Sequence, residues 1–162
     1  MANNIRKITI EDCREERLLI DFKDDFDGIE IGVGQGANLT VNIINLNEAK
    51  SSKIVAKVEE NGELLAVMAD FSSGNANLDV DINLAGNNAR GVWRLSALSS
   101  AQDDKKYNVH FHHLAMNTFG LMDNYGVARN SSRLIFSGAN EIVRGAKFSK
   151  TKQNAKIIVF DQ

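Results

Sequence analysis

The 162-residue sequence contains no proline, one cysteine, one tryptophan and three histidines. Because Cys13 is the only thiol, a single chain cannot form an internal disulfide or a cysteine-ligated zinc or iron–sulfur site. Without proline, the turns must come from glycine, asparagine, aspartate and serine. No run of the roughly 18 apolar residues needed for a membrane-spanning helix occurs, and the N-terminus has no signal-peptide pattern.

The chain also lacks an excess of charge of either sign. Its net charge of −2 at pH 7 provides no general attraction to nucleic acid or to an anionic membrane. The locally basic segment 144–156 is interpreted as a solvated turn, because no ladder of aromatic residues for base stacking accompanies it. The single cysteine fits a reducing compartment. We therefore expect a soluble, cytoplasmic protein without a nucleic-acid or membrane partner.

What the chain does contain is a series of short apolar runs, which alternate with polar residues. The clearest run is 77–85, in which every second residue is apolar, as in a strand with one buried face. Only residues 10–21 have a pattern that could form a short amphipathic helix. Predicted turns separate the runs: "ENGE", "FSSGNAN", "AGNNARG", "LSSAQDDKK", "MDNYG", "NSS" and "SGAN". The sequence therefore predicts one mainly β domain.

Strand-like runs recur every 10 to 15 residues or so, which fits a sandwich, a barrel or a β-solenoid. Asparagine and glycine at many corners favour a solenoid, because narrow corners require left-handed backbone angles that these residues tolerate. No short exact repeat is present. Composition and spacing alone leave a sandwich and a solenoid about equally supported.

Two motifs suggest chemistry but have simpler interpretations. "GVGQGAN" (32–38) resembles a dinucleotide-binding loop, but its third glycine comes too early and a strand follows where a helix should begin. We interpret it as a turn between strands. "DVD" (79–81) places Asp79 and Asp81 on one strand face, a spacing that could suit glycoside hydrolysis. We interpret them as two solvated acids.

All three histidines lie on one predicted strand. On an extended backbone His110 and His112 share a face, while His113 lies on the other. His110 and His112 are therefore the candidate metal ligands, and a site would need a third ligand from elsewhere. Asp103 and Asp104 are near in sequence but lie across a turn. The default interpretation is that the histidines are solvated or form a side-chain ladder.

The last fifty residues, from "HFHHLAMNTFG" through "RLIFSGANEIV" to "AKFSKTKQNAKIIVF", resemble the core of the SufB/SufD family of iron–sulfur cluster assembly scaffold proteins. The resemblance extends over about residues 28–162. It implies an all-β, right-handed parallel β-helix, preceded by an irregular or helical segment at 1–27. The matching residues are His112 or His113, Thr118, Phe136, Gly138, Ile142 or Val143, Ala146, Thr151, Gln153 and Ile157–Ile158.

The departures from the family pattern matter as much as the matches. SufB-type proteins place a cysteine directly after the glutamine that matches Gln153, and this chain has Asn154 there. SufD-type proteins contribute a histidine on a later strand, and the helices that contact the partner ATPase come later still. Neither feature precedes Gln162. The resemblance thus implies a β-helix core without a complete cluster site, with an uncapped end that favours self-association.

We therefore predict a non-enzymatic scaffold or interaction protein linked to iron–sulfur cluster assembly. The resemblance implies a SufC-type ATPase or a SufB/SufD-type protein as partner, and we expect a homo-oligomer. No cofactor is expected in the isolated chain, and an iron–sulfur cluster is implied only by the resemblance. The alternatives are a generic β-solenoid binding module unrelated to cluster chemistry and a metal-dependent enzyme built on the histidine strand.

Overall fold

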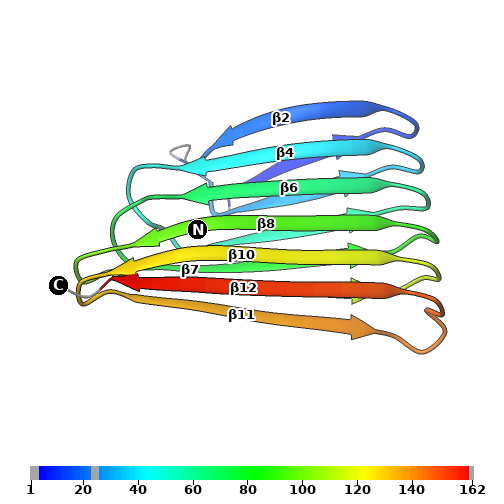
Figure 1. The fold of residues 1–162 in the computed structure, drawn as a ribbon. Coiled ribbons are helices and arrows are strands. Elements are labelled where there is room, and N and C mark those ends of the chain that lie inside the picture. Colours follow the sequence, from blue (N-terminus) through cyan, green and yellow to red (C-terminus); the bar gives the residue numbers. More distant parts are fainter. Residues whose placement is uncertain (1–3, 23–25, 161–162) are drawn as a thin grey trace.

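The computed structural model describes residues 4–22 and 26–160, and these form two parallel six-stranded sheets. The chain alternates between the sheets, so each coil contributes one strand to each, and Figure 1 shows the coils stacked from β2 to β12. The odd sheet contains β1 (Ile5–Ile10), β3 (Gly28–Val33), β5 (Ser52–Val58), β7 (Ala76–Leu84), β9 (Asp104–His113) and β11 (Arg133–Ile142). The even sheet contains β2 (Glu15–Asp21), β4 (Asn38–Asn45), β6 (Glu63–Asp70), β8 (Arg90–Ser99), β10 (Phe119–Arg129) and β12 (Lys150–Phe160).

The hydrophobic core lies between the two sheets. Along β7, for example, alternate residues point inward, so that Leu78, Val80, Ile82 and Leu84 are buried and the residues between them are only partly buried. Parallel in-register pairing stacks equivalent positions of successive coils on one another. The prediction of an all-β parallel β-helix is confirmed. The fold is stable because stacked coils bury a continuous core that one coil alone could not form.

Every turn from an odd strand to the next even strand contains a residue with positive φ. In chain order these residues are Cys13, Gly36, Asn61, Asn88, Asn117 and Phe148. The predicted asparagine and glycine corners are thus confirmed. "GVGQGAN" is one of them, where the Ala37 amide donates to the Gly34 carbonyl at 3.2 Å. The left-handed conformation explains why glycine and asparagine recur there.

Phe148 is the bulky exception in this column of corners. Its φ is +62°, a conformation that costs a residue with a Cβ about 1–2 kcal/mol. Phe148 is 78% exposed, so its packing offsets little of this cost. We expect Phe148→Asn to stabilise the protein by about 1 kcal/mol, measured by urea unfolding. Asn117→Phe, the reverse change at the preceding corner, should destabilise it. A loss of stability in Phe148→Asn would contradict this reasoning.

The helical alternative for residues 10–21 is wrong. Residues 5–10 form β1 and residues 15–21 form β2, which pair in parallel with β3 and β4. Pairing with the second coil overrides the weak helical pattern, because Ile8, Ile10 and Ile20 become buried in the shared core. In the described part of the chain, the structure has no helix that is long and apolar enough to cross a membrane.

Two predicted turns are strand interiors instead. "MDNYG" (122–126) lies inside β10 and "SGAN" (137–140) lies inside β11. Their asparagines face inward and find partners there: Trp93 Nε1 donates to Asn124 Oδ1 at 3.2 Å, and Asn140 Nδ2 donates to Gln153 Oε1 at 3.1 Å. Similarly, only the first part of the basic segment 144–156 is a turn, because β12 begins at Lys150.

A polar cluster is buried at the end of the sheets where β6 ends and β9 begins. Lys105 has no exposed surface, and its Nζ lies 3.4 Å from Asp70 Oδ1. The same ammonium donates to the backbone carbonyls of Ser72 at 2.6 Å and Leu98 at 2.8 Å. Tyr107 Oη donates to Asp70 Oδ2 at 2.7 Å. Burial, together with the Asp70 charge and this bond, raises the pKa of Tyr107, so the phenol keeps its proton.

Candidate metal centre on the outer face of the odd sheet

Strand β9 carries all three histidines, and its alternation divides them as predicted. His110 and His112 lie on the outer face, while His113 is fully buried. His113 Nδ1 lies 2.7 Å from Thr118 Oγ1. Burial, and to a lesser degree the neighbouring His112, lowers the pKa of His113, so this imidazole is neutral in the core. Only the outer pair is available to a ligand from solution.

The structure brings Asp81 of β7 to the two outer histidines. Asp81 pairs in register with His110, and its Oδ1 lies 3.6 Å from both His110 Nδ1 and His112 Nε2. One ligand atom from each of the three residues lies within 4.8 Å of the others. Alternation within one strand did not point to Asp81 as the third member of this group. The signal that could have identified it is the coil register, which places residues 29 positions apart side by side on this face.

Two charged side chains flank this group. Glu141 of β11 pairs in register with His112, and its Oε2 lies 3.1 Å from His112 Nδ1. On the other side, Lys53 of β5 forms an ion pair with Asp81 Oδ2 at 2.9 Å. The cluster therefore extends over four neighbouring strands, from β5 to β11. Across the sheet, the Lys53 ammonium is followed by the Asp81 carboxylate, the two imidazoles and the Glu141 carboxylate.

Asp81 is ionised in this arrangement. Its partial burial acts to raise the pKa of the carboxyl group, but hydrogen bonding and charge from Lys53, together with His112 and His110, outweigh burial and lower that pKa. Asp81 in turn raises the pKa of Lys53. Two imidazoles and one carboxylate are ligand types shared by zinc and by ferrous iron, so the donor set suits a transition metal ion.

The acids near the histidines in sequence lie elsewhere. Asp103 is buried in a turn, where its carboxylate accepts from the amides of Gly74 at 2.8 Å and Ser100 at 3.0 Å. Asp104 forms an ion pair with Arg133 at 3.7 Å. Thus neither reaches the histidines. Of the two acids of "DVD", Asp81 differs from our interpretation as a solvated acid, because it contacts His110 and His112.

The region that matches the family's cysteine position lies on the last coil. Gln153 of β12 faces inward, where its Oε1 accepts from Asn140. Alternation then places Asn154 on the outer face, opposite Asp123 of β10 in register. The one thiol of the chain, Cys13, is exposed in the turn between β1 and β2, where its Sγ lies 3.7 Å from the Gln35 carbonyl oxygen. Figure 1 shows β2 and β12 at opposite ends of the stack.

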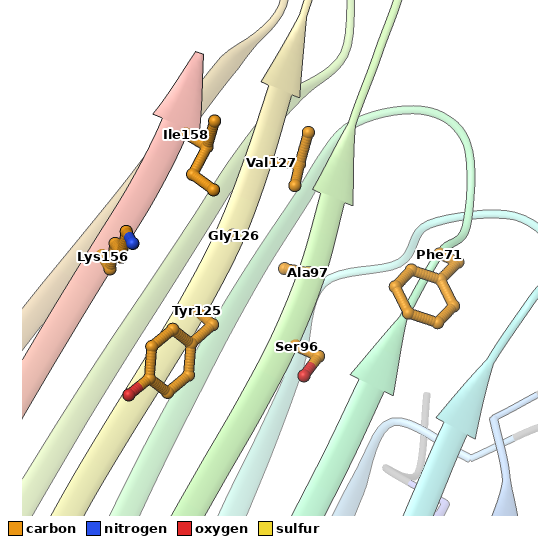
Figure 2. A pocket seen from close by; sticks show the side chains of 8 residues that line it. All are labelled: Phe71, Ser96, Ala97, Tyr125, Gly126, Val127, Lys156 and Ile158. Atoms are coloured by element: carbon orange, nitrogen blue, oxygen red, sulfur yellow. The ribbon is translucent and has the colours of Figure 1, made fainter. Parts of the chain in front are cut away.

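An apolar pocket lies on the outer face of the even sheet, towards the ends of β8, β10 and β12. Figure 2 shows the Tyr125 ring and the Val127 and Ile158 side chains on neighbouring strands, with the Phe71 ring beyond β8. Tyr125 is 49% exposed and Phe71 is 50% exposed. The full lining is Phe71, Ser96, Ala97, Tyr125, Gly126, Val127, Lys156 and Ile158. Exposed aromatic and aliphatic side chains gathered in this way are typical of contact surfaces.

Comparison with known proteins identifies the family. Residues 9–162 match the family model for the SufBD core domain, described as SUF system FeS cluster assembly. No curated protein matched the chain, and no solved structure matched it. The matched span includes all of β3 to β12, and thus also the histidine strand β9. The chain therefore belongs to the SufBD core-domain family of the SUF system, whose members take part in iron–sulfur cluster assembly.

Proposed function

We propose that this protein is a non-enzymatic scaffold or interaction component of iron–sulfur cluster assembly, acting in the cytoplasm without a complete cluster site of its own. The observation that carries the proposal is the position of its thiol. The outer position on β12 that carries a cysteine in SufB-type proteins holds Asn154, and Cys13 lies on the first coil.

The chemistry of a nascent cluster supports this assignment. A cluster under assembly is cargo rather than a resident cofactor, and its iron and sulfur are held by thiolates. A carboxamide such as that of Asn154 neither ionises to a sulfur nucleophile nor carries a persulfide. Cys13 is too isolated to replace it, because one thiol supplies one of the four ligands that a cluster usually takes. The protein would then contribute surfaces rather than sulfur chemistry.

The apolar pocket on the even sheet supports an interaction role. It combines exposed aromatic and aliphatic groups with Lys156, a composition suited to the apolar centre and charged rim of a protein contact. We propose that a SufB/SufD-type protein or a second copy of this chain occupies this face, and that a SufC-type ATPase joins the assembly. The partner would cover Tyr125 and Ile158, which are 49% and 42% exposed.

The proposal is tested by copurification and by reconstitution. We expect the protein to copurify with SufB/SufD-type and SufC-type proteins of the same cell, and a Tyr125→Ser/Ile158→Ser variant to lose this association. Ile135→Ser, on the outer face of β11 in the other sheet, is the matched control and should retain it. Anaerobic incubation of the isolated chain with iron and sulfide should leave no stable chromophore.

Other outcomes would contradict particular parts of the proposal. A stable chromophore that persists in Cys13→Ser would show that the chain holds a cluster without its thiol, and one that disappears in Cys13→Ser would indicate a cluster bridged by two chains. Either result would mean that the cluster site is more complete than proposed. Failure to associate with any SUF protein would favour a generic β-solenoid binding module.

A further inference from the structure

We propose that Asp81, His110 and His112 bind one divalent transition metal ion on the outer face of the odd sheet, with Glu141 orienting His112. This inference goes beyond the scaffold role, and it does not depend on it. The ion would be of the class that accepts nitrogen and oxygen ligands together, such as Zn²⁺, Co²⁺ or Fe²⁺. Its ligands would be Asp81 Oδ1, His110 Nδ1 and His112 Nε2.

The spacing of the three ligand atoms supports a shared ion. Asp81 Oδ1 lies 3.6 Å from each imidazole nitrogen. This is longer than the about 2.7–3.2 Å of a normal hydrogen bond to nitrogen. It is close to the about 3.3 Å that separates two ligands at a tetrahedral ion with bonds of about 2.0–2.1 Å. The two imidazole nitrogens also lie within 4.8 Å of each other, so side-chain rotations that bring them closer together would complete the site.

Glu141 fixes the tautomer of His112. Its carboxylate can only accept, so at 3.1 Å it selects the form of His112 that carries a proton on Nδ1. A neutral His112 then has its lone pair on Nε2, directed to the same region as Asp81 Oδ1. A carboxylate on the far nitrogen of a metal-binding histidine is the usual arrangement for fixing the tautomer and raising its basicity.

The ligand types also determine which metal ions the site would bind. Mg²⁺ and Ca²⁺ prefer oxygen ligands, so two imidazoles select against them. Three protein ligands on an exposed sheet surface leave at least one coordination position open to water or to a ligand from a partner. His110 and His112 side chains are 48% and 28% exposed, so an ion can reach them from solution.

Lys53 competes with the metal ion for the charge of the Asp81 carboxylate. Its Nζ binds Asp81 Oδ2 at 2.9 Å and leaves Oδ1 directed to the histidines. The ammonium thus holds the carboxylate in position, but its charge also opposes a second cation nearby. We expect Lys53→Met to bind the metal more tightly than the native chain, since the repulsion is removed while all three ligands remain.

Isothermal titration of the tag-free chain with Zn²⁺, supported by the visible absorption of bound Co²⁺, tests the proposal. We expect one equivalent of either ion per chain and no comparable binding of Mg²⁺ or Ca²⁺. Removal of a ligand in Asp81→Asn, His110→Ala or His112→Ala should abolish stoichiometric binding. Glu141→Gln, which changes only the orienting group, should weaken binding by about 10- to 100-fold.

The matched control is Asp79→Asn. Asp79 lies on the same strand and the same outer face as Asp81, but its Oδ1 accepts from Asn108 Nδ2 at 2.7 Å rather than facing the histidines. This variant should bind Zn²⁺ as the native chain does. Because all the altered residues lie on the outer face, thermal melting should show that each variant folds. Absence of Zn²⁺ and Co²⁺ binding, or equal loss in Asp79→Asn and Asp81→Asn, would overturn the proposal.

Discussion

Replacing Asp70 by alanine is expected to destabilise the protein by about 3–5 kcal/mol, because it leaves the Lys105 ammonium buried without its counter-charge. The Lys105 side chain is 0% exposed and that of Asp70 is 3% exposed, so water cannot take the place of the lost carboxylate. The substitution also removes the acceptor of the Tyr107 hydroxyl. Urea unfolding followed by circular dichroism would measure the loss.

Two further variants distinguish the effect of the unpaired buried charge from the general effect of removing an acidic residue. Glu30→Ala breaks the exposed ion pair with Lys7, whose atoms lie 3.0 Å apart, and should cost less than about 1 kcal/mol. The double variant Asp70→Asn/Lys105→Met removes both charges and should recover much of the stability lost in Asp70→Ala. If Asp70→Ala costs no more than Glu30→Ala, the cluster at Lys105 does not hold a buried ion pair.

Trp93→Ala is expected to cost about 3–5 kcal/mol, the range for deleting a large aromatic side chain from a core. Trp93 is fully buried on β8, where its neighbours in register are Ala66 and Met122. Ala66 is small, so it fills little of the volume that the indole would leave. The deletion also takes away the donor to Asn124, a residue that is only 2% exposed.

Trp93→Phe distinguishes the two contributions. It retains an aromatic ring but leaves the Asn124 carbonyl without its donor, so a smaller loss of about 1–3 kcal/mol is expected. Because Trp93 is the only tryptophan, unfolding should be followed by circular dichroism rather than by intrinsic tryptophan fluorescence. Equal losses in the two variants would show that the hydrogen bond, and not the packing volume, accounts for the contribution of Trp93.

Local patterns in the sequence were sufficient for the strands that alternate strictly. The run at 77–85 predicted β7 because its inner residues are all apolar, and corner residues such as Asn88 and Asn117 marked turns because left-handed φ angles restrict residue choice. The same reasoning failed for "MDNYG" and "SGAN". There, asparagines usually found in turns are inward-facing strand residues with hydrogen-bond partners on other strands.

The residues that carry the family resemblance explain why it predicted the fold more fully than the site. Phe136 packs against the core, and Gly138 and Gln153 meet inside the last coil, where a Cβ on Gly138 would lie 2.4 Å from the glutamine amide nitrogen. Thr118 holds the buried His113 at 2.7 Å. These positions are constrained by packing, so they identify the β-helix rather than its chemistry.

The sequence by itself determined the mainly β class, the division of the three histidines between two faces, and the absence of a thiol beyond Cys13. Each of these depends on residue identity or on the two-residue period of a strand, which are local properties. Only the tertiary structure decided that Asp81 and Glu141 flank His112 and that Lys53 holds Asp81. Those contacts depend on the coil register, which is set by how whole coils stack and bury their inner side chains, and no single strand contains that information.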